Sequence, residues 1–261
     1  IMGSVFVLGV SSWFLIKKRD EEFALASIKI GASLGLIASV LIAWTGDGSA
    51  YQVAQKQPMK LAAMEGLYQG QKQAGLVAFG ILNPEKTSYK NDADAFLVKF
   101  QIPYVLSFLA KRDVDGFVPG ITDLIEGGYE TANGPALCAQ EKIAKGKIAI
   151  LALSDYRKAI KDKDETAMKE HRKVLDANFA YFGYGYIKDP AHLVPNVPMT
   201  FYAFRIMVIL GGYFILLFLT TTILSIKGTF ENKKWLHYMC LWTIPLGYIA
   251  GEAGWVVAEV G

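Results

Sequence analysis

Four stretches of the chain are almost entirely apolar, and they predict helices that cross a membrane. They cover residues 1–17, 23–45, 198–226 and 235–260. A membrane-spanning helix needs about 20 apolar residues, so the first stretch predicts a helix that is cut at its start. The predicted fold class is an all-α, polytopic membrane helix bundle of four spans, with the first and last truncated. We expect an internal piece of a longer polytopic protein.

Two short loops, each between consecutive apolar stretches, are rich in Lys and Arg and predict the orientation of the spans. Residues 17–19 read KKR, and residues 227–234 carry three lysines. Short loops with this bias face the cytoplasm, whereas long domains cross the membrane largely regardless of their charge. Residues 46–197 are therefore expected to form a large extracytoplasmic loop domain between the second and third spans.

The expected loop domain has two parts with different patterns. Residues 46–123 are mixed, and the run at 96–110 has the composition of a buried segment. In residues 141–179, apolar positions recur at multiples of three and four between charged residues, which predicts a solvated helical hairpin. We place its break near residues 161–164. The aromatic residues at 181–186 are typical of a membrane-interface belt.

Composition supports a mixture of membrane spans and one polar segment. Of 261 residues, 52% are hydrophobic, and the mean hydropathy is +0.28. A net charge of +3 without a dense basic stripe argues against nucleic acid as a partner. Cys138 and Cys240 show neither CxxC nor Cys/His zinc spacing, so we expect two unrelated thiols.

Three residues inside the predicted spans are candidates for chemistry, namely Glu252, Arg205 and Met207. Glu252 is flanked by Gly and apolar residues, where a carboxylate requires a partner; a helix–helix ion pair or hydrogen bond, a proton relay and a metal ligand are the alternatives. Arg205 stays charged and requires an anion, such as a carboxylate, a lipid phosphate or a haem propionate. Met207 is either a packing residue or an axial haem ligand.

Asp47, Lys60 and Glu65 stand where the second apolar stretch gives way to the loop, in the string GDGSAYQVAQKQPMKLAAMEG at residues 46–66. Acids and a base at the mouth of a membrane can bind and deprotonate a lipid-soluble molecule such as a quinol. The alternative is a solvated loop with ordinary surface charges. If residues 60–65 are helical, Lys60 and Glu65 point about 140° apart and hold different roles.

Four strings together resemble subunit I of the cytochrome bd-type quinol oxidases, in the order found in that family. They are the string at 46–66, FLVKFQIPYVLSFLAKRDVDG at 96–116, FYAFRIMV at 201–208 and EAGWVVAEVG at 252–261. The resemblance covers nearly all of the chain except about residues 131–173, which look like the insertion of the long-loop members.

The resemblance implies roles for six residues. Lys60 and Glu65 match the quinol-site Lys and Glu, and Asp47 matches the acid at the membrane edge of the loop. Met207 matches the axial Met of the low-spin haem b, with Arg205 beside it. Glu252 matches the carboxylate ligand of the high-spin haem b.

The implied enzyme is a ubiquinol or menaquinol oxidase of the prokaryotic cytoplasmic membrane, which reduces dioxygen to water. It would use the two b haems and haem d and would need a second membrane subunit. A quinone-contacting wall becomes the second interpretation of the aromatic residues at 181–186. The family's His ligand is expected just before Ile1, so this piece alone is expected to be inactive. Tyr248 stands where some members have Trp.

A function of another class is also compatible with the spans. A non-enzymatic polytopic transporter or receptor would bind a solute in the outer domain. Arg205 and Glu252 would then form an ion pair inside the membrane.

Overall fold

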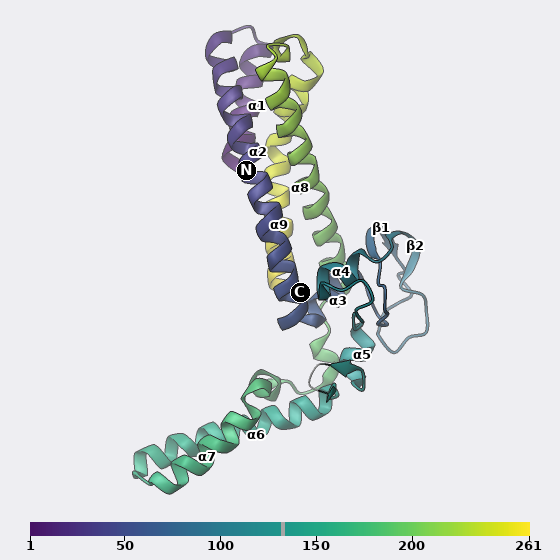
Figure 1. The fold of residues 1–261 in the computed structure, drawn as a ribbon, viewed down its shortest axis with the longest axis vertical. Coiled ribbons are helices and arrows are strands. Elements are labelled where there is room, and N and C mark those ends of the chain that lie inside the picture. The colour runs from purple at the N-terminus through teal and green to yellow at the C-terminus, as the bar shows by residue number, and fades with distance from the viewer. Residues whose placement is uncertain (132–133) are drawn as a thin grey trace. The chain divides into compact units, whose positions relative to one another are not determined.

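The computed structural model describes residues 1–131 and 134–261, and these residues are mostly helical (Figure 1). They form two units, residues 1–53 with 198–261 and residues 54–197, which we describe one at a time. The helices of the first unit are α1 (Met2–Ile16), α2 (Glu21–Lys56), α8 (Val197–Ile226) and α9 (Lys234–Val260), and a 3-10 turn, η3 (Phe230–Asn232), precedes α9.

The four helices of the first unit lie side by side and share one apolar core (Figure 1). Each helix contributes fully or almost fully buried side chains, among them Leu8, Ile28, Phe218 and Cys240. Glycines permit the close approach: a Cβ on Gly35 of α2 would collide with the ring of Phe218 of α8. Small residues at helix contacts are the usual means by which membrane helices pack closely.

Among the residues that the structure describes, two helical segments have the length and composition to cross a membrane. They are α2 and the segment Pro190–Ile226, which contains α8. The helix α1 has the composition but only 15 residues. On α2, Ile30 is 63% exposed and Leu34 is 58% exposed, as expected for side chains that face lipid. The four-span bundle is therefore supported in two of its helices, and α1 and α9 remain proposed spans.

Helix α2 does not end where its hydropathy does. The prediction ended the span at residue 45, but the helix continues without a break to Lys56. The next residues, Gln57 and Pro58, form the N-terminus of α3 (Pro58–Glu65). Asp47 thus lies within a helix and not in an irregular loop, because Gly46 and Gly48 are tolerated in a helix whereas Pro58 starts a new one.

The expectation of an all-α chain is wrong in the second unit. Strands β1 (Leu76–Leu82) and β2 (Phe96–Ile102) form an antiparallel pair in which Phe79 faces Phe100 and Ile81 faces Val98. Aromatic and β-branched residues favour strands over helices. The run at 96–110 was also expected to be buried, but in β2 Phe100 is 65% exposed. A second pair, β3 (Glu130–Thr131) and β4 (Gly134–Pro135), is short.

The remaining elements of the second unit are helical. They are α4 (Val105–Lys111), α5 (Ile121–Glu126), α6 (Ala139–Asp162), α7 (Glu165–Asn178) and the 3-10 segments η1 (Phe179–Tyr186) and η2 (Pro190–Leu193).

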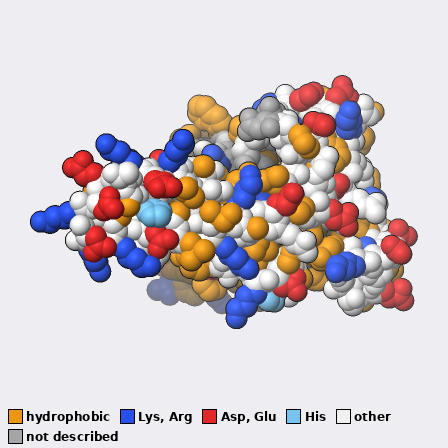
Figure 2. All heavy atoms as spheres, turned by 90° about the horizontal axis from the view of Figure 1, so that it is seen from below, with side chains coloured by type: hydrophobic (Ala, Val, Ile, Leu, Met, Phe, Trp, Pro, Cys, Tyr) orange, Lys and Arg blue, Asp and Glu red, His pale blue; other side chains and the backbone are white. Residues whose placement is uncertain are grey.

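The predicted hairpin at 141–179 is confirmed as α6 and α7, and so is its break. Lys163 ends α6 in the left-handed region (φ 56°), and the Asp164 side chain accepts hydrogen bonds from the N–H groups of Thr166 and Ala167 at the start of α7. Figure 2 shows basic and acidic side chains intermixed over the far end of this hairpin. The hairpin is therefore solvated at that end.

Candidate functional site

Glu65 is the last residue of α3, and its placement follows from the residues around it. Pro58 opens the helix, and Gly66 closes it in the left-handed region (φ 61°). The N–H of Leu67 reaches back to the Ala62 carbonyl oxygen at 2.8 Å, which completes the helix end. Glu65 is only 3% exposed, so the carboxyl group is held among other protein atoms at the point where the chain turns.

The chain after Gly66 is fixed by a ladder of backbone hydrogen bonds to residues 118–122. The N–H groups of Ile121 and Thr122 donate to the carbonyl oxygens of Leu67 and Tyr68, each at 2.9 Å. Further along, residues 71 and 118 exchange two backbone hydrogen bonds of 3.1 Å. The segment that follows Glu65 is thereby placed against the start of α5.

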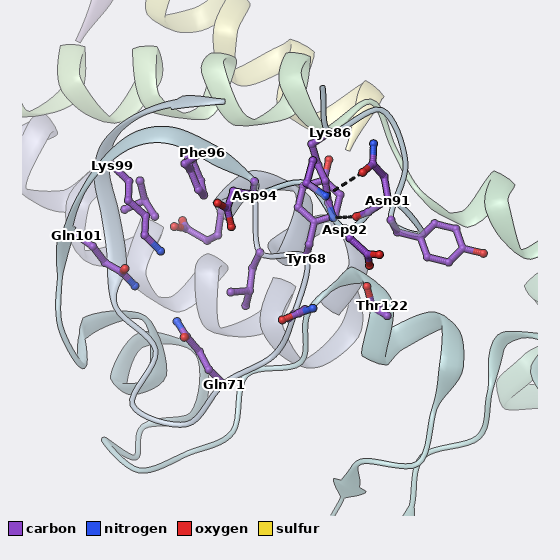
Figure 3. Close-up of a pocket in the computed structure, with 18 of the residues that line it drawn as sticks. Tyr68, Gln71, Lys86, Asn91, Asp92, Asp94, Phe96, Lys99, Gln101 and Thr122 are labelled. Atoms are coloured by element: carbon purple, nitrogen blue, oxygen red, sulfur yellow. Dashed lines mark hydrogen bonds between the residues drawn. The ribbon is translucent and has the colours of Figure 1, made fainter. Parts of the chain in front are cut away.

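A cavity of about 730 Å³ opens beside this segment, within the second unit (Figure 3). One wall is formed by residues 65–71, another by β2 and a third by the loop between the strands. The polar residues that matter below are Glu65, Tyr68, Lys86, Asp94, Lys99 and Gln101. Acidic and basic side chains thus face the same space.

Tyr68 and Lys86 meet at one end of the cavity. The Lys86 ammonium lies 4.9 Å from the centre of the Tyr68 ring and donates a hydrogen bond to the Asn91 carbonyl oxygen (Figure 3). Burial raises the pKa of the Tyr68 phenol above its ordinary value, because the phenolate loses its hydration. At neutral pH this group is therefore a neutral phenol.

Lys60 and Glu65 share helix α3, but only Glu65 is among the residues that line the cavity. They are five positions apart in the helix, which turns their side chains about 140° apart. The sequence predicted this divergence on the condition that residues 60–65 are helical, and α3 meets that condition. Asp47 is half-buried on α2 and belongs to the first unit, so it is described with that unit and not with Glu65.

Arg205 is buried within the first unit. It is 7% exposed, and its guanidinium carbon lies 4.7 Å from the ring centre of Phe201 and 5.1 Å from that of Phe204. These are cation–π distances. The aromatic residues of the FYAFRIMV string thus shield the charge from its surroundings.

Met207 and Glu252 lie at nearly the same level of the helix bundle. A Cβ on Gly254 of α9 would stand 3.3 Å from the Met207 sulfur, so the thioether faces α9. Glu252 precedes Gly254 by two residues, which is about 3 Å along the helix and about 200° around it. Glu252 is exposed in this chain. Met207 of α8 therefore lies near one side of α9, at Gly254, whereas Glu252 projects from another side of α9.

Met207 carries a thioether, a group that can ligate haem iron. Among residues 1–131 and 134–261, no three His, Cys, Asp or Glu side chains gather closely enough to hold a metal. A haem iron takes four nitrogens from its porphyrin and only axial ligands from the protein, and a methionine thioether is one such ligand. Met207, at a contact between helices, and Glu252, on another side of α9, suit two separate groups.

Sequence reasoning missed Tyr68, Lys86 and Asp123. Asp123 accepts hydrogen bonds from Gly70 and Gly120. The glycine and aspartate in GITD, three positions apart, are a helix-start signal that could have pointed to it. Tyr68 and Lys86 carry no local signal, because 18 positions of chain separate them.

Comparisons with known proteins identify relatives along the whole chain. The sequence model of the family described as "Cytochrome bd terminal oxidase subunit I" matches residues 1–261. The chain is 31% identical over 278 residues to cytochrome bd-II ubiquinol oxidase subunit 1 of Escherichia coli K12, which covers 100% of this chain and 50% of that relative. It is 27% identical to cytochrome bd ubiquinol oxidase subunit 1 of Bacillus subtilis 168, over 99% of this chain and 42% of that relative.

A solved structure agrees at the level of the fold. The bd oxidase from Geobacillus thermodenitrificans matches with a TM-score of 0.64 at 22% identity, over 100% of this chain and 43% of that one. The chain spans about half the length of the curated relatives it matches. The transporter or receptor interpretation finds no such relative among these matches. From end to end, the chain belongs to the cytochrome bd terminal oxidase subunit I family, a family of oxidoreductases.

Proposed function

We propose that this chain is part of a quinol:dioxygen oxidoreductase, a terminal respiratory oxidase that oxidises a membrane quinol and reduces oxygen to water. The observation that carries the proposal is the family match over residues 1–261. Two relatives named as ubiquinol oxidases support the substrate class. The enzyme would be the full-length subunit with its partners.

The chemistry at Glu65 supports this reaction. Oxidation of a quinol releases two protons, and a carboxylate within hydrogen-bond reach of a quinol hydroxyl can accept one of them. Glu65 is buried at the edge of a cavity that also presents phenol, amide and ammonium groups. We assign Glu65 the role of proton acceptor, Lys60 that of orienting the quinol oxygen, and Asp47 that of an acid near the membrane edge.

The spans supply the other half of the proposed enzyme. Haems of the low-spin b, high-spin b and d types, when bound, would supply one-electron transfer and oxygen reduction. Met207 would hold the low-spin haem b and Glu252 the high-spin haem b, and the buried Arg205 would neutralise an acidic group beside the former. Met207 of α8 lies near Gly254 of α9, whereas Glu252 points to another side of α9; this is consistent with two separate groups.

We further propose a location in the prokaryotic cytoplasmic membrane, with α1, α2, α8 and α9 as four spans and residues 46–197 on the outer side. The Lys-rich short loops support this orientation. Lipid, quinol and a second membrane subunit are the proposed partners.

The test is a spectrum combined with an oxygen electrode. Membranes that carry the full-length protein with its partner subunit should show b- and d-type bands when reduced-minus-oxidised spectra are recorded, together with oxygen uptake driven by quinol. A colourless preparation without quinol-driven uptake contradicts the proposal and favours a transporter or receptor.

Met207→Leu is expected to alter the low-spin b band and to lower the midpoint potential of that haem, because methionine ligation raises the potential. Spectra at poised potentials measure both quantities. Met239→Leu on α9 is the matched control, since Met239 is exposed and has no assigned role. An unchanged b band and potential in Met207→Leu would rule out this residue as a ligand.

A further inference from the structure

One carboxylate joins the two sides of the backbone ladder that follows Glu65. The Asp123 Oδ2 atom accepts a hydrogen bond from the Gly70 N–H at 2.6 Å and another from the Gly120 N–H at 3.0 Å. Gly70 lies in the segment that lines the cavity, and Gly120 lies at the start of α5. A single side-chain oxygen is thus shared by both segments.

The two glycines allow the two segments to approach more closely than any residue with a Cβ would. A Cβ on Gly70 would stand 2.8 Å from the same Asp123 oxygen and 2.6 Å from the Phe117 ring, and a Cβ on Gly120 would stand 2.6 Å from the Tyr68 carbonyl oxygen. The segments are therefore in direct backbone contact. An ionised carboxylate is a strong acceptor for N–H groups. Asp123 therefore stabilises the backbone contact between the segment at Gly70 and the start of α5 at Gly120.

Glu65 lies only a few residues from the contact that Asp123 stabilises. Only Gly66 separates it from Leu67, whose carbonyl oxygen accepts from Ile121, two residues before Asp123. Gly66 is in the left-handed region and joins Glu65 directly to the segment that contacts α5. If the segment shifts on α5, the direction of the Glu65 side chain shifts with it.

We propose that Asp123 is a positioning residue for Glu65. Its carboxylate holds residues 67–71 against the start of α5 and thereby fixes the Glu65 carboxyl group at the cavity. This inference rests on the proposed function, because it assigns Asp123 a role in quinol oxidation through Glu65. It makes Asp123 matter to turnover although Asp123 is not among the residues that line the cavity.

The test is a double-mutant cycle in the full-length oxidase with its partner subunit, with quinol kcat as the readout. The four proteins are the unmodified enzyme, Asp123→Ala, Glu65→Gln and the double variant. We expect Asp123→Ala to lower kcat about 10-fold or more, since a displacement of about 1 Å can cost about 100-fold. In the Glu65→Gln background the same change should cost less than about twofold, because residues that act as a unit are not additive.

Controls separate positioning from general damage. Reduced-minus-oxidised spectra of every variant should be unchanged. Asp113→Asn should keep full kcat, since the Asp113 side chain is exposed and accepts a hydrogen bond from the nearby Asp115 N–H, within its own loop. If Asp123→Ala does not assemble, Asp123→Asn replaces it in the cycle, because it keeps one acceptor oxygen but loses the charge. Asp123→Asn is expected to lower kcat by less than Asp123→Ala does. This loss should again appear only in the enzyme that retains Glu65.

Three outcomes would overturn the inference, and those that spare the role of Glu65 are distinguishable from the one that does not. An equal loss from the Asp123 change in both backgrounds, or no loss in either, means that Asp123 does not act through Glu65, while the role of Glu65 stands. Unchanged kcat in Glu65→Gln alone means that the proposed quinol chemistry at Glu65 is wrong, and the inference fails with it.

Discussion

Glu65→Gln is expected to lower quinol oxidation by about 100-fold or more, since general acid–base groups contribute about 10²–10⁴-fold. The amide has nearly the shape of the carboxyl group but cannot accept a proton. Glu65 is buried at the end of α3, so a water molecule would not easily replace it. The measurement is quinol-driven oxygen uptake by the full-length oxidase, and the haem bands should be unchanged because the change lies outside the spans.

The matched control is Glu170→Gln, which removes a carboxylate from the exposed face of α7 and should retain full turnover. Lys60→Ala should also reduce turnover. Its effect should fall on KM more than on kcat, because orienting a quinol oxygen is a binding role. Normal turnover in Glu65→Gln would remove this residue from the quinol chemistry, whatever the family of the chain.

The helices of this fold could be predicted from hydropathy, but their ends could not. Apolar runs located α2 and α8, because burial in lipid or in a core requires such runs. The end of α2 was misplaced at residue 45, since hydropathy reports the medium around a helix and not its hydrogen bonds. The helix ends where Gln57 and Pro58 begin α3, 11 residues beyond the predicted end (56 − 45 = 11).

The packed face of α6 does not follow from its large apolar residues alone. Among those that recur with helical spacing, Ile143 is buried but Ile160 is 48% exposed. The buried residues also include Gly146, Ala149 and Ala152. Small residues are buried because their neighbours approach closely, and hydrophobicity gives them little weight. A pattern that counts size as well as polarity would have found this face.

The candidate site was predictable only in part. Glu65 and Lys60 were singled out from the string at 46–66. Residues 60–65 are helical in α3, so the two side chains point in different directions, as predicted for a helix. The cavity beside Glu65 could not be predicted, because its walls come from segments up to 61 positions apart (Glu65 to Glu126, 126 − 65 = 61). Strand β2 was read as a buried run since its register with β1 depends on contacts that the local pattern does not contain.

Gly185→Leu is expected to detach η1 from α6 and to weaken local stability by about 3 kcal/mol, the upper part of the usual range for overpacking. A Cβ on Gly185 would stand 2.5 Å from the carbonyl carbon of Gly146. Backbone atoms cannot turn aside as a side chain can, so the two segments must separate. Lys145 would then lose its position 5.3 Å from the centre of the Tyr181 ring.

Hydrogen exchange of the whole protein measures this effect segment by segment. Peptides from α6 and η1 should exchange about 100-fold faster, which corresponds to about 3 kcal/mol of opening free energy. Gly183→Leu is the matched control: it places the same side chain in the same 3-10 segment, where a Cβ meets nothing within 4 Å. Equal exchange in the two variants would contradict the close packing of Gly146 and Gly185. A slowing confined to Gly183→Leu would contradict it as well, since the open position should be indifferent to size.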